Sequence, residues 1–213
     1  MAIIEDGVLA GNLFDKYGSR NPVVRYIMKE FHDSLFSLIA LSGTSEVHEV
    51  GCGEGNLSIS LAKQDIRVVA SDFSEQVINI ARDNANKANV KIEFKVASIH
   101  DLTPADSANL VLCSEVLEHL DDPQNAIRVL HGLADPFLIV SVPNEPMWRI
   151  LNMVRFSYIS GLGNTPGHVQ HWSRRSFLQF LSPHFDILDV RMPIPWIMVL
   201  CRSKDNNVPQ SRT

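Results

Sequence analysis

The chain has 213 residues, of which 45% are hydrophobic and 20% charged, and its formal net charge is -5. This composition is that of an ordinary globular domain, and an acidic chain without a Lys/Arg block argues against a nucleic-acid partner. No apolar run reaches the length of a membrane span and no basic leader opens the chain, so we expect a cytoplasmic protein without membrane insertion.

The predicted elements begin with an irregular stretch over residues 1–21. A helix should follow from Pro22, because apolar residues recur at helical spacing as far as Gly43. Strands then alternate with helices, a rhythm that predicts an α/β fold. The expected strands cover residues 46–50, 66–72, 91–97, 108–114 and 136–142. The expected helices cover residues 55–63, 74–87 and 123–132, and Ser74 is the expected N-cap of the second.

The rhythm breaks at residues 143–170, which are rich in Pro and Gly and which we interpret as an insertion with a short helix around residues 147–156. A helix over residues 173–181 and two final strands close the chain. Because no helix separates those two strands, they should form an antiparallel hairpin. The pattern therefore predicts a Rossmann-like, doubly wound sheet that is mostly parallel, with helices on both faces.

The stretch HEVGCGEGNLSISLA places three glycines at the C-terminal end of the first core strand. Glycine lets a ligand approach the backbone closely, although a tight strand–helix turn without any ligand would explain the same residues. Glu49 precedes the glycines and would repel a pyrophosphate, but it suits a ligand with an ammonium group. Asp72 ends the next strand, where a carboxylate can accept hydrogen bonds from ribose hydroxyls. These residues favour a nucleoside with a cationic or zwitterionic tail.

Three stretches resemble the class I methyltransferases that use S-adenosylmethionine. EVGCGEG (residues 49–55) is similar to their first motif and VVASDFSEQVINIAR (residues 68–82) to their second. NLVLCSEVLEHLDDPQNAIRVL (residues 109–130) resembles the ubiquinone-biosynthesis type and its small-molecule relatives. The resemblance covers roughly residues 45–203. It implies S-adenosyl-L-methionine as the cofactor and a seven-stranded sheet whose last strand is antiparallel.

The resemblance also implies a single methyltransferase domain over residues 1–213. Its parts would be an N-terminal helical lid (1–44), a cofactor-binding core (45–142), a substrate-pocket insertion (143–172) and a C-terminal helix and hairpin (173–203). The expected cofactor-binding residues are Tyr17, Glu49, Gly51, Cys52, Gly53, Gly55, Asp72, Phe73, Ser98, Ile99, Ser114 and Glu115. Many relatives carry an Asp where Ser98 stands, so the contact with adenine departs from the usual pattern.

Methyl transfer to a hydroxyl requires the acceptor to lose a proton, and histidine is a suitable base near neutral pH. The candidates are His119, which follows the fourth strand, and His168 and His171, which precede the helix over residues 173–181. Structural hydrogen bonding is the alternative role for each. We therefore predict transfer to a small-molecule acceptor with an apolar or aromatic body, with a slight preference for oxygen.

Two alternatives remain open at the level of sequence. The small-RNA 2′-O-methyltransferases resemble the pattern of Glu115, Glu118, His119 and His168, which in a metal-assisted RNA 3′-end enzyme would hold a divalent ion. The leading interpretation assigns no metal. The other alternative is a non-catalytic subunit that only binds the cofactor, since the glycines and Asp72 argue for binding alone.

Overall fold

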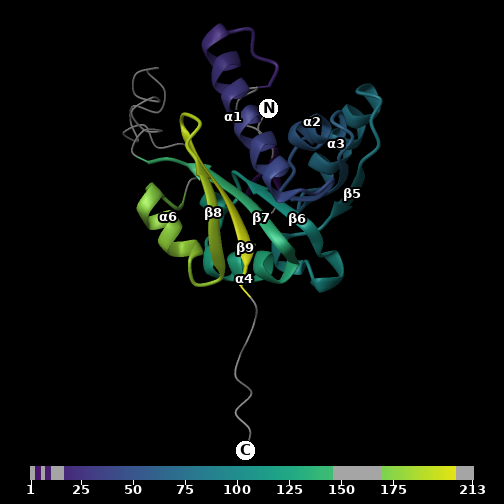
Figure 1. Ribbon diagram of the computed structural model, residues 1–213. Coiled ribbons are helices and arrows are strands. Elements are labelled where there is room, and N and C mark those ends of the chain that lie inside the picture. The colour runs from purple at the N-terminus through teal and green to yellow at the C-terminus, as the bar shows by residue number, and fades with distance from the viewer. Residues whose placement is uncertain (1–2, 6–7, 11–16, 146–168, 205–213) are drawn as a thin grey trace, which may run out of the picture.

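The computed structural model describes residues 3–5, 8–10, 17–145 and 169–204 (Figure 1). Its centre is a seven-stranded sheet in the order β5-β4-β3-β6-β7-β9-β8. The strands are β3 (Glu46–Val50), β4 (Arg67–Asp72), β5 (Glu93–Val96), β6 (Ala108–Ser114), β7 (Ala134–Pro143), β8 (Phe185–Arg191) and β9 (Trp196–Ser203). The first five are parallel, and β9 is antiparallel to both β7 and β8. The predicted fold, including the antiparallel last strand, is confirmed.

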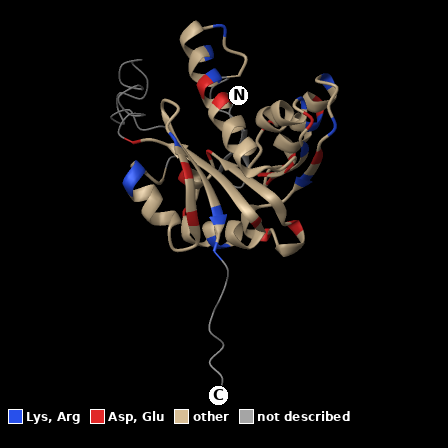
Figure 2. Cartoon of the chain, in the orientation of Figure 1, with Lys and Arg blue, Asp and Glu red and all other residues tan. Residues whose placement is uncertain are grey.

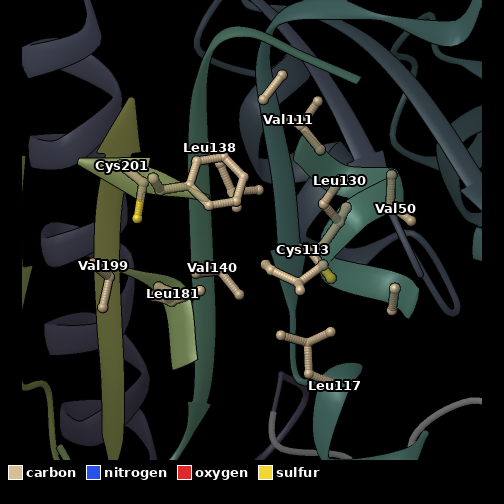
Figure 3. Close-up of a cluster of buried hydrophobic side chains, with 14 of the residues drawn as sticks. Val50, Val111, Cys113, Leu117, Leu130, Leu138, Val140, Leu181, Val199 and Cys201 are labelled. Atoms are coloured by element: carbon tan, nitrogen blue, oxygen red, sulfur yellow. The ribbon is translucent and has the colours of Figure 1, made fainter. Parts of the chain in front are cut away.

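Helices cover both faces of the sheet, each over its own hydrophobic cluster. The helices are α1 (Pro22–Ser42), α2 (Asn56–Ala62), α3 (Glu75–Lys87), α4 (Pro123–Leu133) and α6 (Arg174–Leu181). Residues of α1, α2 and α3 belong to one cluster, and residues of α4 and α6 to the other. Figure 3 shows part of the second cluster, with Val111, Cys113 and Leu138 among its side chains. Along β6, Val111 and Cys113 face this cluster while Leu112 faces the other, so the strand is buried on both sides.

Helix ends follow the local sequence signals. The Asn21 side chain accepts a hydrogen bond from the Val23 amide at 2.9 Å, and Gly43 ends α1 in the left-handed region. Ser74 caps α3 as predicted, because its hydroxyl accepts from the Val77 amide at 3.2 Å. These caps fix where α1 and α3 begin, and α3 starts three residues after Asp72, the acid at the end of β4.

The N-terminal stretch differs from its prediction. Instead of irregular chain, β1 (Ile3–Glu5) pairs antiparallel with β2 (Val8–Ala10). Three-residue strands are too short for an alternation pattern to reveal them, so the prediction was wrong. The predicted helix at 147–156 lies outside the described residues. None of the described helices has the length and apolar character required to cross a membrane.

Candidate cofactor site

The strand order reverses at β3, which lies between β4 and β6. The glycine loop follows β3 at this point, where open α/β sheets bind their ligands. The amides of Gly51 and Cys52 both donate to the Ser71 carbonyl of β4, at 2.8 and 2.9 Å. The Gly55 amide donates to the Cys52 carbonyl at 3.0 Å, which closes the turn before α2 begins. The loop is thus held by backbone hydrogen bonds to the neighbouring strand.

Each of the three glycines has a positive φ, from 53° to 78°. A Cβ at Gly51 would lie 2.3 Å from a methyl carbon of Val116, and one at Gly55 would lie 3.1 Å from the Cβ of Ala81. Gly51 and Gly55 are therefore required by close packing as well as by backbone conformation. A Cβ at Gly53 would meet no atom of the described residues within 4 Å. The loop is open at its middle glycine, where a ligand can lie against the backbone.

Asp72 closes the loop from the end of β4. One of its carboxylate oxygens accepts from the Gly53 amide at 2.9 Å, and the other accepts from the Ser74 amide at 3.1 Å. A carboxylate oxygen has more than one lone pair, so these bonds are compatible with the predicted contact to ribose hydroxyls. Asp72 therefore also shapes the loop, a role that sequence reasoning did not assign to it.

Glu49 lies beneath the loop and is 2% exposed. The pKa of its carboxyl is raised from 4.5 to about 8: burial is the main cause, hydrogen bonds from Ser58 oppose the shift, and the charge of the nearby Asp72 adds to it. The Ser58 hydroxyl of α2 donates to the carboxylate. A cation that enters the site would stabilise the ionised form of this buried carboxyl, which fits the predicted ammonium group.

Tyr17 lies beside the same loop, at the start of the segment that leads into α1. Burial raises the pKa of its phenol, and the carboxylates of Glu49 and Glu54 raise it further. Its ring meets that of His32 edge-on, with the centroids 6.1 Å apart. Tyr17 packs against the hydrophobic cluster that includes Cys52 of the loop, which is compatible with its predicted role of covering the cofactor.

On the predicted adenine side, Phe73 follows Asp72 directly and is half-buried. Ser98 is the N-cap of the short helix η1 (Ile99–Asp101), and its hydroxyl accepts from the His100 amide at 3.3 Å. The Ile99 side chain is buried in the hydrophobic cluster under α4. Ser98 therefore has a local structural role, and Asp101, which could replace the missing acid, is exposed at the end of η1.

Ser114 ends β6 and Glu115 follows it, at the edge of the sheet where the methionine end of the cofactor is predicted. The Ser114 hydroxyl is 2.7 Å from that of Ser141 on β7. Glu115 has a φ of 57° and accepts a hydrogen bond from the indole N–H of Trp196 at 2.8 Å. The sequence analysis did not include Trp196 in the site. The signal that could have identified it is a tryptophan at the start of a strand on the ligand edge of the sheet.

Two of the three candidate bases lie in the described residues. His119 ends the short helix η3 (Leu117–His119), and its amide donates to the Val116 carbonyl at 3.0 Å. His171 is exposed, and its Nδ1 lies 3.7 Å from a carboxylate oxygen of Glu145, which is 9% exposed. His168 lies outside the described residues. The pairing of His171 with Glu145 was not foreseen.

The segment before α6 is held against η3. The carbonyl of Glu118 accepts from the amides of Val169 and Gln170 at 2.8 and 3.0 Å, and the Glu145 amide donates to the Trp172 carbonyl at 2.8 Å. These bonds bring the chain on either side of the insertion to the ligand edge of the sheet. Across residues 17–145 and 169–204, no group of three or more His, Cys, Asp or Glu is arranged to hold a metal ion.

A separate open cavity of about 630 Å³ lies between α3 and the start of β4 and β5. Its lining includes the basic residues Arg67, Arg82 and Lys91 and the acidic residue Glu93. Figure 2 shows several blue Lys and Arg positions around α3 and β5. The Arg67 guanidinium lies 3.4 Å from Glu46, which offsets part of that charge. No predicted site residue lines this cavity, so it is distinct from the glycine loop.

The strand order is that of a Rossmann-like methyltransferase fold, and the glycine turn after β3 and the acid at the end of β4 form its candidate nucleoside site. In agreement, residues 47–136, from β3 into β7, match the family of methyltransferase domains. Over these residues the chain is similar to methyltransferase domains, and the glycine loop and Asp72 both lie within the matched segment.

Similar curated proteins include the ubiquinone biosynthesis O-methyltransferase of Xanthomonas campestris pv. campestris (strain B100), which is 33% identical over 135 residues, or 61% of this chain and 56% of the relative. The protein of the same name from Xanthomonas axonopodis pv. citri (strain 306) is 32% identical over 123 residues, or 55% of this chain and 52% of the relative. The chain thus spans about half the length of the curated relatives it matches.

Solved structures with the same fold include magnesium protoporphyrin IX methyltransferase from Synechocystis PCC 6803 with bound S-adenosylhomocysteine. Its TM-score is 0.67 at 24% identity, over 88% of this chain and 90% of that one. The N-methyltransferase NodS from Bradyrhizobium japonicum WM9, in complex with the same nucleoside, gives a TM-score of 0.65 at 18% identity, over 91% and 94% of the two chains. At these identities the likeness shows the fold.

Proposed function

We propose that this chain transfers a methyl group from S-adenosylmethionine to a small-molecule acceptor, with oxygen as the preferred attacked atom. The observation that carries the proposal is the open glycine loop closed by Asp72, within the segment that matches methyltransferase domains. When bound, the nucleoside supplies a methyl group activated by a sulfonium centre.

The residues at the loop suit the two ends of this nucleoside. Asp72 offers carboxylate oxygens at the place where ribose hydroxyls are expected, and Gly53 leaves the backbone accessible. Glu49 is a buried carboxyl that the ammonium group of the methionine moiety would favour in its ionised form. Tyr17 can cover the same region and limit the access of water.

The preference for oxygen rests on the His171 pair and on the name of the curated relatives, which are O-methyltransferases. A proton on Nδ1 of His171 would face Glu145 and leave Nε2 as the acceptor of a proton. Nε2 would accept the proton of the acceptor hydroxyl as the oxygen–carbon bond forms, while the sulfur–methyl bond of the bound cofactor would break and S-adenosylhomocysteine would leave. Glu145 orients the ring in this scheme, and general-base catalysis of this kind contributes about 10²–10⁴-fold to rate.

The cofactor site is tested by calorimetric titration with S-adenosylhomocysteine. We expect micromolar binding to the wild type and at least about tenfold weaker binding to Asp72→Asn, because the amide offers one acceptor oxygen instead of two. Asp83→Asn on the exposed face of α3 is the matched control and should bind as the wild type does. A wild type that is folded by circular dichroism but binds no nucleoside would contradict the proposal.

Turnover is tested by the release of S-adenosylhomocysteine with a catechol that carries an alkyl chain as the probe acceptor. We expect His171→Gln to lower kcat by about 10²-fold while the affinity for the nucleoside stays unchanged. The competing acceptor is a short RNA with a free 3′ end, tested with and without Mn²⁺. Metal-dependent methylation of the RNA alone would favour the RNA-end alternative, and nucleoside binding without turnover on any acceptor would favour a non-catalytic subunit.

A further inference from the structure

Trp196 joins three segments that are far apart in the sequence. It is the first residue of β9 and is 3% exposed. Its indole N–H donates to the Glu115 carboxylate at 2.8 Å, across 81 positions of the chain. Its ring packs edge-on against Phe31 of α1, with the ring centroids 4.9 Å apart. The side chain therefore links the closing hairpin and α1 to the loop after β6.

Glu115 occupies a backbone conformation that it would not adopt by itself. Its φ of 57° lies in the left-handed region, which is unfavourable for a residue with a Cβ. Two hydrogen bonds hold it there: its amide donates to the Ser141 carbonyl at 3.0 Å, and its carboxylate accepts from Trp196. Strained residues of this kind persist where their surroundings determine the conformation, and they concentrate at functional sites.

The conformation of Glu115 sets the position of the next residue. The Val116 side chain fills the space in which a Cβ of Gly51 would lie, with one methyl carbon only 2.3 Å from that position. Gly51 is the first glycine of the cofactor loop. A contact chain thus runs from Trp196 through Glu115 and Val116 to the loop.

We propose that Trp196 is a positioning residue, which holds Glu115 and thereby shapes the methionine end of the cofactor site. This inference rests on the proposed function, because it assigns a role in binding the same nucleoside. Trp196 does not contact the cofactor in this scheme. It acts through the hydrogen bond to Glu115, so the removal of the indole N–H should weaken nucleoside binding even when the ring packing is kept.

The test compares Trp196→Phe with Trp172→Phe. Phenylalanine keeps an aromatic ring beside Phe31 but has no N–H to donate. Trp172 is the matched control, because it packs on Phe177 and Phe180 and its indole N–H has no hydrogen-bond partner in the described part of the chain. We expect Trp196→Phe to raise the Kd for S-adenosylhomocysteine about 5–20-fold and Trp172→Phe to change it less than twofold. Urea unfolding of both variants separates this effect from a general loss of stability.

A double-mutant cycle shows whether Trp196 acts through Glu115. Glu115→Met keeps an unbranched side chain of similar length and removes the carboxylate, so it should weaken binding by a similar factor. In that background Trp196→Phe should change the Kd less than twofold. If Trp196→Phe does not fold, the weakening by Glu115→Met tests the same hydrogen bond from its other end.

Three results would overturn the inference while leaving the proposed function intact. The first is a wild-type Kd for S-adenosylhomocysteine in Trp196→Phe. The second is an equal rise in Kd for Trp172→Phe. The third is a rise in Kd on Trp196→Phe that is the same in the wild type and in Glu115→Met. Wild-type affinity in Glu115→Met would do so where Trp196→Phe does not fold. A folded wild type that binds no S-adenosylhomocysteine would instead overturn the proposed function, and this inference would fall with it.

Discussion

Binding of the nucleoside should release a proton from Glu49. In the ligand-free protein the pKa of this carboxyl is about 8, because the side chain is buried and Asp72 is nearby. At pH 7 roughly nine-tenths of the Glu49 side chains are then protonated. An ammonium group close to the carboxyl favours the ionised form, so binding at pH 7 should release up to about 0.9 proton per site.

The same linkage makes the affinity depend on pH. If Glu49 is ionised in the complex, each binding event between pH 6 and pH 7 must first remove its proton, so the affinity should rise about ninefold over this unit. The assay is titration calorimetry with S-adenosylhomocysteine in phosphate and in Tris, whose different ionisation enthalpies report the number of protons released. 5′-Methylthioadenosine, which lacks the amino-acid portion, is the matched ligand and should bind without proton release.

The Glu49→Gln variant should lose both the proton release and the pH dependence. It should also be the more stable ligand-free protein in alkali. A carboxyl whose folded pKa is raised contributes stability that is present below pH 4.5 and is lost as pH rises through about 8, and glutamine has no such loss. The upper bound of this difference is roughly 5 kcal/mol. Binding enthalpies at pH 7 that are equal in the two buffers would refute the assignment of Glu49 to the ammonium group.

Three further predictions concern the frame of the site. Gly51→Ala should abolish nucleoside binding, because its Cβ would overlap Val116. The Cβ of Gly53→Ala would meet no described atom, so this variant should lose only about 1 kcal/mol of unfolding free energy through its positive φ. Both are read by calorimetry and urea unfolding. Burial lowers the pKa of His48, so the stability that its neutral form contributes is present above about pH 6.5 and is lost as pH falls. The unfolding free energy of His48→Gln should therefore decline less than that of the wild type between pH 7 and pH 5. Ser74→Ala should lower the unfolding free energy by about 1 kcal/mol through loss of the α3 cap, and an unchanged urea midpoint would contradict this.

The arrangement of the candidate cofactor residues could be predicted from sequence because its signals are local. The glycines, Glu49 and Asp72 lie at the ends of two strands, and the parallel pairing of those strands brings the ends together. Both β3 and β6 have the residue limits that the sequence indicated. The expected strand at 91–97 shortened to Glu93–Val96, since it is an edge strand with only β4 to pair with.

The side-chain contacts of Trp196 and His171 could not be predicted, because each joins residues whose sequence positions share no local pattern. Trp196 meets Glu115 across 81 positions, and His171 meets Glu145 across the insertion. Neither pair shows a fixed spacing or a periodic pattern. Only the fold decides that the closing hairpin returns to the edge where β6 ends, so only the structure reveals the link.

This division has a physical basis. The loop around Gly51 is held by backbone hydrogen bonds to Ser71, by the Asp72 carboxylate and by the Val116 side chain, so it is set by residues at the ends of β3, β4 and β6. The predicted acceptor side instead involves the side chains of His171 and Glu145, and backbone hydrogen bonds to Glu118 hold the segment before α6 in place there. On this argument, exchanges around Glu145 and His171 should alter acceptor choice while the affinity for the nucleoside stays near that of the wild type.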